Sequence, residues 1–452
     1  MSGPTSSSMA QASDRASEGL EPPVAPSQSH SPARIRAGIS WTYAASIVST
    51  AAQWAILFLL ARKGGPAALG TYALATAIVN PIFLLSNLQL REIQATDALG
   101  RFSFSTIWAV RILSTCIALL IVSCIAIFGQ YEQYFGIALL LVALARSMEA
   151  LSDSIHGQLH RLERLDWIAR TTSSRTLVAL ILSGILYHIT ESLASVLASM
   201  AISSAFFLIA VDLRSLRRLT RDSTGSYFPR PRIVKGELVP LLRSAVPLGL
   251  VMLLVGLNAN IPRYAIEVFL GREQLGVFAA MAQLLMAGSI VLRAPAQALS
   301  PRMARAAASG DHLSLRKDLG RLYLLAAFLT VGGTTLSAVA GSEILGLLYS
   351  ERFAGHASVL TLLAAGSVFS FWASVTGYGL TAARIHGAQL PILAATTVVA
   401  ASLAVVLIPR FDILGAALAQ ILAGFTQFVL GYLVLRSAWS PKGKKGELTT
   451  PS

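Results

Sequence analysis

Hydrophobic residues form long runs along most of the chain, and short polar connections separate these runs. A helix needs about 20 mostly apolar residues to cross the hydrocarbon core of a bilayer. Twelve windows of this kind lie near residues 39–61, 69–90, 105–128, 135–158, 172–189, 191–212, 239–262, 274–297, 321–341, 357–382, 391–409 and 414–436. The pattern predicts an all-α integral membrane protein with twelve transmembrane helices. Only "YHITES" separates the fifth and sixth windows, which predicts a tight helical hairpin there.

The longest polar connection, "LRSLRRLTRDSTGSYFPRPRIVKGE", divides these windows into two sets of six. We expect two pseudo-symmetric six-helix bundles, an N-terminal lobe at 37–212 and a C-terminal lobe at 239–438, joined by a cytoplasmic linker at 213–238. Residues 1–36 are rich in Ser, Pro, Ala and Gln and lack the apolar run of a secretory signal, so a disordered cytoplasmic tail is predicted. Residues 439–452 form a second polar tail, whose lysines favour anionic lipid heads.

A short phrase of the form G-x-x-x-L-G-x-aromatic-A occurs once in each half of the chain, at a constant offset. The two copies are Gly65, Leu69, Gly70, Tyr72 and Ala73, and Gly271, Leu275, Gly276, Phe278 and Ala279. Each copy follows the first predicted span of its half and opens the second. The halves are therefore predicted to be parallel structural repeats, related by an axis along the membrane normal. The alternative is that these small residues serve only close helix packing.

Composition and charge narrow the class of protein further. Hydrophobic residues make up 54% of the chain and charged residues 13%, which excludes an ordinary soluble protein. The net charge is +14, and Lys and Arg are concentrated in the connections that share one side if both termini are cytoplasmic. Because this asymmetry accounts for most of the charge, no nucleic-acid partner is expected. Cys116 and Cys124 lie inside one apolar run and do not suit a disulfide framework.

Four segments of the sequence carry a resemblance to a known family. They are "WTYAASIVSTAAQWAILFLLARKGGPAALGTYALATAIV", "LGREQLGVFAAMAQLLMAGSIVLRAPAQALSPRMA", "LYSERFAGHASVLTLLAAGSVFSFWASVTGYGLTAARIHG" and "LGAALAQILAG". In order and spacing they resemble the polysaccharide (Wzx-type) flippase branch of the multidrug/oligosaccharidyl-lipid/polysaccharide exporter superfamily, over most of residues 37–438. The resemblance implies a V-shaped pair of six-helix bundles that moves a lipid-linked oligosaccharide from the inner to the outer leaflet of a bacterial cytoplasmic membrane.

The chain departs from that family near the end of the seventh predicted span. Many members carry an acidic residue before the arginine at this place, where this chain has Asn260, Ile261, Pro262 and Arg263. If a carboxylate there couples transport to a cation, this protein achieves the coupling otherwise. The drug-exporter branch is matched less well, because the first span, 39–61, contains no Asp or Glu.

The cargo implied by the resemblance, an isoprenoid diphosphate bearing sugars, is anionic and rich in hydroxyl groups. Arginine can bind phosphate oxygens in a bidentate way, and amides suit sugars. Candidates of these types for a substrate cavity are Arg293, Arg263, Asn258, Asn260, Asn80, Asn87 and Arg91. We assign the diphosphate to Arg293 and Arg263 and the sugars to the asparagines. The alternatives are snorkelling to the membrane surface for Arg293 and helix–helix hydrogen bonding for the asparagines.

Ionisable residues follow one face of the fourth predicted span at steps of three and four. They are Arg146, Glu149, Asp153, His156 and His160. Two interpretations remain open, a structural polar seam against a neighbouring helix and a proton-linked relay, since histidine titrates near neutral pH. Arg111 and Arg243 each lie near a predicted cytoplasmic end, and we expect both to snorkel to the surface.

The polar connections contain no P-loop, metal-ligand cluster or paired carboxylates in a sizeable loop, so neither an enzyme nor a bound metal or cofactor is expected. We predict a transporter of the bacterial inner membrane that moves a lipid diphosphate-linked oligosaccharide by alternating access, for surface or exopolysaccharide biosynthesis. Its expected partners are that substrate, membrane lipids, and a polysaccharide polymerase with its chain-length machinery. The alternatives are a cation-coupled exporter of small amphiphiles on the same fold and a membrane-embedded polysaccharide polymerase.

Overall fold

The N-terminal half of the protein folds into a bundle of long helices. The structure is a computed structural model, and it describes residues 32–97, 100–162, 164–224 and 231–438. The helices of this half are α2 (Pro32–Leu59), α3 (Gly65–Asn87), α4 (Leu90–Thr96), α5 (Phe104–Phe128), α6 (Gln133–Arg161), α7 (Leu165–Thr190), α8 (Leu193–Phe207) and α9 (Leu213–Thr224). Two π-helical turns, η1 (Leu60–Gly64) and η2 (Leu208–Asp212), extend α2 and α8.

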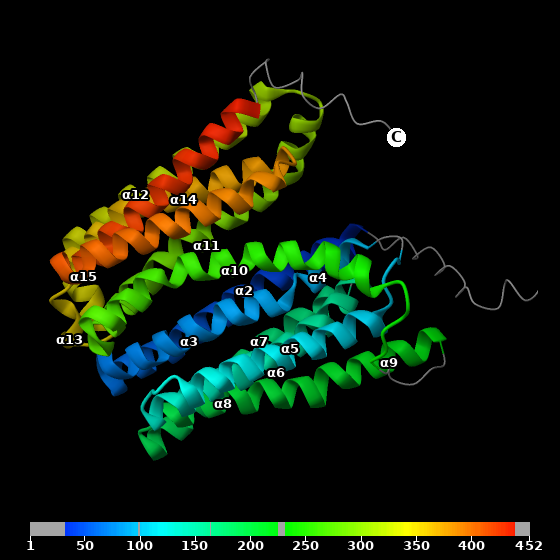
Figure 1. Cartoon of the computed structure of the whole chain (residues 1–452), viewed down its shortest axis with the longest axis horizontal. Coiled ribbons are helices and arrows are strands. Elements are labelled where there is room, and N and C mark those ends of the chain that lie inside the picture. Colours follow the sequence, from blue (N-terminus) through cyan, green and yellow to red (C-terminus); the bar gives the residue numbers. More distant parts are fainter. Residues whose placement is uncertain (1–31, 98–99, 163, 225–230, 439–452) are drawn as a thin grey trace, which may run out of the picture.

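The C-terminal half forms a second bundle. Its elements are α10 (Leu238–Leu270), α11 (Arg272–Ala308), α12 (His312–Leu348), α13 (Glu351–Ala354), α14 (Ala357–Ala382), the 3-10 turn η3 (His386–Ala388) and α15 (Gln389–Ala438). Asp412 has a non-helical backbone, with φ 52° and ψ −136°, and α15 turns back on itself there (Figure 1). The two arms of α15 correspond to the last two predicted windows.

Each of the twelve predicted windows falls on a helix, so the all-helical fold is confirmed. Within the described residues, nine stretches are long and apolar enough to cross a membrane. Gln389–Ser437 contains two predicted windows, and Ala44–Thr96 contains one and all but the first five residues of another. The count of twelve crossings stays a prediction. The predicted hairpin is confirmed, because α7 ends at Thr190 and α8 begins at Leu193.

Several helix ends differ from the predicted boundaries. Residues 32–36 of the predicted tail already belong to α2, whose first residue is a proline, and proline suits the first helical position. Residues 1–31 and 439–452 lie outside the described residues. The first part of the predicted linker is not extended chain but the helix α9.

The two bundles lie close together at one end of the molecule and diverge toward the other (Figure 1). We call the first end, which carries the connections 60–65, 129–132 and 270–272, the convergent end. The opposite end, which carries 88–103 and 308–312, is the divergent end. Both the start of α2 and the end of α15 lie there (Figure 1). The resulting shape is a V, which the family resemblance implied.

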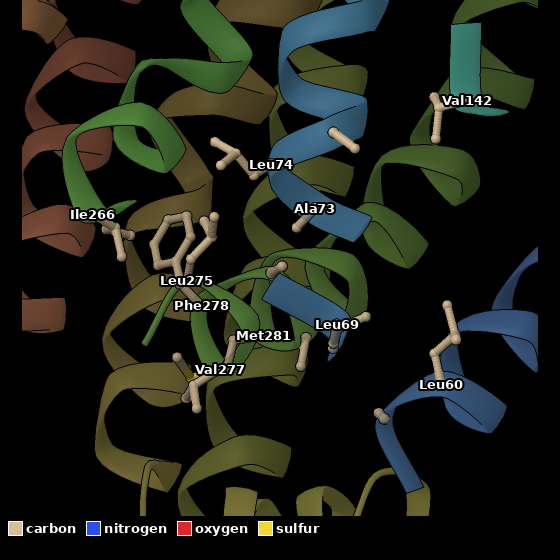
Figure 2. Packing of buried hydrophobic residues seen from close by; sticks show 14 of the residues in the cluster. Leu60, Leu69, Ala73, Leu74, Val142, Ile266, Leu275, Val277, Phe278 and Met281 are labelled. Atoms are coloured by element: carbon tan, nitrogen blue, oxygen red, sulfur yellow. The ribbon is translucent and has the colours of Figure 1, made fainter. Parts of the chain in front are cut away.

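A shared hydrophobic core explains why the bundles meet at the convergent end. Leu60 and Leu69 of the N-terminal half and Phe278, Tyr349 and Phe353 of the C-terminal half belong to one buried cluster, part of which Figure 2 shows. A second cluster draws only on the C-terminal bundle and another only on the N-terminal bundle. Because apolar burial stabilises roughly in proportion to area, the shared cluster fixes the contact at this end.

The two copies of the repeated phrase meet at the centre of this contact. A Cβ atom placed on Gly70 would lie 1.8 Å from the backbone oxygen of Arg272, and one on Gly276 would lie 1.9 Å from that of Pro66. The first glycine of each copy also has the same backbone conformation, with φ 75° and ψ −174° at Gly65 and φ 84° and ψ 178° at Gly271. Glycine adopts this conformation at little cost. The copies therefore start two helices alike, and their second glycines let these helices cross backbone to backbone.

Side chains around the glycine crossing hold the bundles together. The rings of Phe58 and Tyr349 are 5.2 Å apart, and Arg62 Nη2 donates a hydrogen bond of 2.6 Å to the backbone oxygen of Leu347. Arg272 Nη1 lies 3.5 Å from Glu132 Oε2, and its guanidinium carbon lies 4.7 Å from the ring centroid of Phe135. Each pair joins one bundle to the other. Separating the bundles at the convergent end therefore means breaking all of these contacts.

Helix α10 packs against α3 of the other bundle along much of its length. A Cβ on Gly249 would lie 3.0 Å from the backbone oxygen of Leu85, and one on Gly256 would lie 3.1 Å from the Cα of Pro81. Closer to the convergent end, the Tyr264 hydroxyl donates to the backbone oxygen of Ala77. Small residues allow this approach of two helix backbones, as in many membrane bundles. The α3–α10 seam thus closes one flank of the molecule.

Candidate functional site

A cluster of charged and polar side chains lies between the two bundles. We call it the central polar cluster; it consists of Tyr72 of α3, Arg146 and Glu149 of α6, Arg175 of α7 and Arg263 of α10. Arg146 Nη1 donates to Glu149 Oε2 at 2.8 Å. Tyr72 interacts electrostatically with Arg146, Glu149 and Arg263, and Glu149 also interacts with Arg175. Tyr72 therefore connects the charges of the N-terminal bundle to Arg263 of the C-terminal one.

Part of the central polar cluster is exposed. The side chains of Arg146 and Glu149 are 38% and 29% exposed although they lie in the middle of α6. A charged group in the middle of a membrane helix is too costly to leave in hydrocarbon, so such groups face a neighbouring helix or a water-filled space. Because these two keep open surface, we infer that they line a hydrated space between the bundles.

The net charge of the cluster is positive. It contains three guanidinium groups and one carboxylate, and arginine stays protonated under all ordinary conditions. Within the described part of the chain, no carboxylate lies within ion-pair distance of Arg175 or Arg263. The cluster can therefore bind an anion with two charges, and the planar arginine donors suit phosphate oxygens.

Asn260 stands near Arg263 in the segment where many family members carry an acidic residue, and its contacts show how this difference affects the site. Asn260 is buried, donates to the backbone oxygen of Gly256 at 2.7 Å and accepts from Arg263 Nη1 at 2.9 Å. An amide oxygen thus orients the guanidinium as a carboxylate would, but it does not neutralise the charge. Helix α10 continues to Leu270, so Arg263 lies two turns inside the helix and not at its end as the sequence suggested.

A second group of polar contacts corrects the prediction for Arg111. The side chain of Arg111 is 0% exposed, so the expectation that it snorkels to the surface is wrong. Its Nε donates to Ser154 Oγ at 2.8 Å, its Nη1 to Asn87 Oδ1 at 2.6 Å, and its Nη2 lies 3.4 Å from Asp153 Oδ2. A buried cation needs such partners, because burying an unpaired charge is very costly. Arg111 thus ties α5 to α3 and α6.

Two of the residues predicted to line the substrate cavity, Asn87 and Arg91, belong to the polar contacts around Arg111 and Asp153. Asn87 accepts from Arg111, and Arg91 Nη1 lies 3.0 Å from Asp153 Oδ1. Asp153 therefore bridges two arginines. These contacts favour the helix–helix interpretation for Asn87, which the sequence left open, and they leave Arg91 partly exposed at 33% of its side-chain surface.

The ionisable stripe of the fourth predicted span divides among three neighbours. Arg146 and Glu149 face the central polar cluster, and Asp153 pairs with Arg91 and Arg111. His156 Nε2 lies 3.3 Å from Asp212 Oδ1, and His160 is exposed. The five residues share one face of α6, as predicted, but that face meets a different partner at each turn.

The remaining candidates are placed less centrally. Arg293 is exposed on α11, closer to the divergent end than the central polar cluster is, and within the described residues it has no ion pair. The helix α11 continues through Pro295 and ends at Ala308. Asn80 of α3 and Asn258 of α10 are both half-buried. The cavity roles of these residues stay predictions.

Sequence reasoning missed Arg175 and Asp212. Both are charged residues inside or beside an apolar window, which is the signal that selected Arg293 and could have selected them. Asp212 was missed because it was counted as the end of a span. Tyr72 was noticed only as part of the repeated phrase, and its position between two arginines could not be seen without the fold.

Comparisons with known proteins identify the family. The family model of polysaccharide biosynthesis proteins matches residues 35–307. The chain belongs to this family. It is 23% identical to the capsular polysaccharide biosynthesis protein CapF of Staphylococcus aureus over 394 residues, which are 87% of this chain and 97% of CapF. The resemblance to the polysaccharide flippase branch is confirmed at this level.

Solved structures show the same fold. An inward-facing multidrug resistance MATE family transporter of the MOP superfamily has a TM-score of 0.71 at 13% identity, with 88% of this chain and 96% of that chain covered. The lipid II flippase MurJ in an inward closed conformation has a TM-score of 0.70 at 14% identity, covering 88% of this chain and 87% of that chain. The polysaccharide biosynthesis protein described here is thus a multi-pass membrane protein whose neighbours in fold are transporters.

Proposed function

We propose that this member of the polysaccharide biosynthesis family moves a lipid diphosphate-linked oligosaccharide across the bacterial inner membrane by alternating access. The observation that carries the proposal is the central polar cluster, with a net positive charge between two bundles that share a buried core at the convergent end and are joined by α10 along one flank. A diphosphate carries the complementary charge. Alternating access needs two lobes that rock around such a site, and two bundles with equivalent starting helices suit that motion.

The parts of the cargo are assigned to different residues. Arg263 and Arg175 bind the diphosphate, since among the described residues neither has a carboxylate within ion-pair distance, while Arg146 is partly occupied by Glu149. Arg293, exposed toward the divergent end, makes the first contact with the entering head group. Asn258 and Asn80 face the sugars, Asn260 holds the Arg263 guanidinium in place, and the isoprenoid tail stays in the bilayer.

The divergent end faces the cytoplasm in this proposal. Its connections hold most of the lysines and arginines close to the span ends, as the positive-inside rule requires of the cytoplasmic side. Both chain termini are then cytoplasmic. A polysaccharide polymerase and its chain-length machinery would use the translocated product on the other side of the membrane.

The charge of the site argues against the runner-up function, a cation-coupled exporter of small amphiphiles. An acidic site would attract a cationic amphiphile, and a basic site would repel it. The central polar cluster is basic. A membrane-embedded polymerase is less favoured because the neighbours in fold are transporters.

Leaflet exchange in proteoliposomes tests the proposal. We expect the purified protein to move a fluorescent undecaprenyl diphosphate oligosaccharide between leaflets, and Arg263→Ala to lower the apparent affinity about 10- to 100-fold. This range corresponds to the loss of one or two charge-assisted hydrogen bonds of roughly 1.5–3 kcal/mol in total. Arg293→Ala is expected to reduce the rate less, because it acts at entry.

The matched control is Arg436→Ala, which removes an exposed arginine of α15 far along the chain from the central polar cluster. It should exchange the lipid as the wild type does. A wild-type protein that moves no lipid-linked glycan but exports small cationic dyes would replace the proposal with the exporter. An Arg263→Ala variant with unchanged affinity would remove the cationic site from the mechanism.

A further inference from the structure

A buried histidine–aspartate pair lies in the N-terminal bundle, away from the central polar cluster. His156 Nε2 of α6 is 3.3 Å from Asp212 Oδ1 of η2, and the two side chains are only 5% and 1% exposed. The second carboxylate oxygen of Asp212 is buried and has no hydrogen-bond partner within the described structure. Neither residue has a part in the binding of the proposed cargo. A buried polar atom left without a partner needs an explanation.

The surroundings of the pair are apolar. Ile155 and Leu159, which flank His156 on α6, belong to one hydrophobic cluster together with Leu208 and Leu216, which flank Asp212. In such a setting an isolated ionised carboxylate is strongly disfavoured. Asp212 is therefore stable only if it is protonated or if His156 is protonated beside it. In either form the pair holds one proton, and removing that proton leaves a buried negative charge without a counter-charge.

Other charges near the divergent end do not replace His156 in this role. On the elements packed against α6 and η2, the ionisable side chains toward that end are Asp153, His160 and Arg161 on α6, Arg91 and Glu92 on α4, Arg111 on α5, Asp166 and Arg170 on α7, and Arg214, Arg217 and Arg218 on α9. The helix α8 carries none in Leu193–Phe207. Arg91 and Arg111 are both engaged by Asp153. In the described residues, the ion pair of Asp212 is the one with His156.

The position of the pair connects it to the central polar cluster through α6. Asp212 is the last residue of a π-helical turn, and such turns are frequent at functional sites. His156 lies two turns along α6 from Glu149, on the same face as the central polar cluster. A change in the packing of α6 on η2 would therefore reach the cargo site through one rigid helix.

We propose that His156 and Asp212 form a proton-binding site that couples protonation to the conformation of the bundle. The proton lies between Nε2 of His156 and Oδ1 of Asp212 in the conformation described. Its release to water leaves Asp212 ionised, and α6 and η2 separate so that water can reach the carboxylate. Its return restores the packed state, so the coupling ion is a proton held in α6 and η2 rather than in the first or seventh span.

The inference rests on the proposed transport cycle, but its test needs no oligosaccharide. In nanodiscs, spin labels at positions 162 and 313, in a background with Cys116 and Cys124 replaced by Ser, report the separation of the bundles at the divergent end. Leu162 and Leu313 are 42% and 80% exposed, so labels there disturb little packing. Distance distributions are compared at about pH 5 and about pH 8, and we expect the wild-type distribution to differ between them.

The pair holds its proton in the described conformation, in which the bundles diverge at this end, so the distances should be long at low pH. Asp212→Asn imitates the protonated carboxyl and should give these long distances at both pH values. His160→Gln, which removes an exposed histidine one turn from His156, is the matched control and should respond as the wild type does. If Asp212→Asn does not fold, His156→Gln carries the test, and a displaced midpoint supports the proposal.

A wild-type distribution that ignores pH overturns the proposal, and so does an unchanged pH response in Asp212→Asn or, if that variant does not fold, in His156→Gln. An intact pH response with no leaflet exchange of the lipid-linked oligosaccharide would overturn the proposed cargo and leave the proton site standing.

Discussion

Replacing Gly70 by alanine is expected to abolish leaflet exchange. The added Cβ would lie 1.8 Å from the backbone oxygen of Arg272, roughly half the ordinary contact distance of about 3.5 Å or more. The obstructing atom belongs to the backbone of α11, so no side-chain rotation can relieve the contact. The helices α3 and α11 must separate, and the contacts of the convergent end separate with them. Overpacking of this kind costs about 1–3 kcal/mol even where neighbours can adjust.

The measurement combines leaflet exchange with the thermal unfolding midpoint of Gly70→Ala, Gly276→Ala and the double variant. Because either substitution forces the same two helices apart, the double variant should be less destabilised than the sum of the two single variants. Gly333→Ala on α12 is the control, since a Cβ there meets nothing within 4 Å. It should raise the midpoint slightly, as alanine replaces glycine inside a helix. Normal exchange by Gly70→Ala would show that the crossing is not tight in the working protein.

Arg111→Met is expected to be the most destabilising single substitution of a charged residue in the N-terminal bundle. Removing one member of a buried ion pair costs about 3–5 kcal/mol, because it leaves the other charge uncompensated. Here Asp153 would keep only Arg91, and Asn87 and Ser154 would each lose a donor. The predicted result is a large fall in the thermal unfolding midpoint.

A double substitution separates charge from packing in this test. Arg111→Met combined with Asp153→Leu removes both charges, and apolar replacement of a whole buried pair is often close to neutral, so it should recover part of the lost stability. Arg101→Met is the comparison: its side chain is 70% exposed and its Nε lies 3.7 Å from the buried Asp97, so it should cost less than Arg111→Met. Equal midpoints for Arg111→Met and Arg101→Met would contradict the buried role of Arg111.

The membrane architecture could be predicted from the sequence because long apolar runs have few alternatives in a bilayer. Helix ends were less predictable. The seventh window stopped at 262, but α10 continues to Leu270, because Arg263 and Glu267 lower the hydropathy of a segment that is still helical. The repeated phrase was noticed in the sequence, whereas the contact between Gly70 and Gly276 depends on how the two bundles are docked.

The candidate site was predictable only in part. The stripe on the fourth span could be found because residues three and four apart share a helical face. The partners of that stripe could not, since Arg111 is 42 residues from Asp153 and Asp212 is 56 residues from His156 along the chain. Arg111 looked like a surface residue because its distance from the span end was known and its neighbours were not. A buried charge is recognised from its partner, and the partner is set by tertiary packing.

The close fit of α3 and α10 closes one flank of the molecule to lipid chains. Gly249, Gly256 and Tyr264 bring the two helices together so tightly that a chain of isoprene units cannot slide between them. A cargo of the proposed kind crosses the membrane while its tail remains among the lipids, and so it needs a slit that stays open along the whole crossing. The α3–α10 seam cannot supply that slit, so the proposed cargo has to pass on another flank of the molecule.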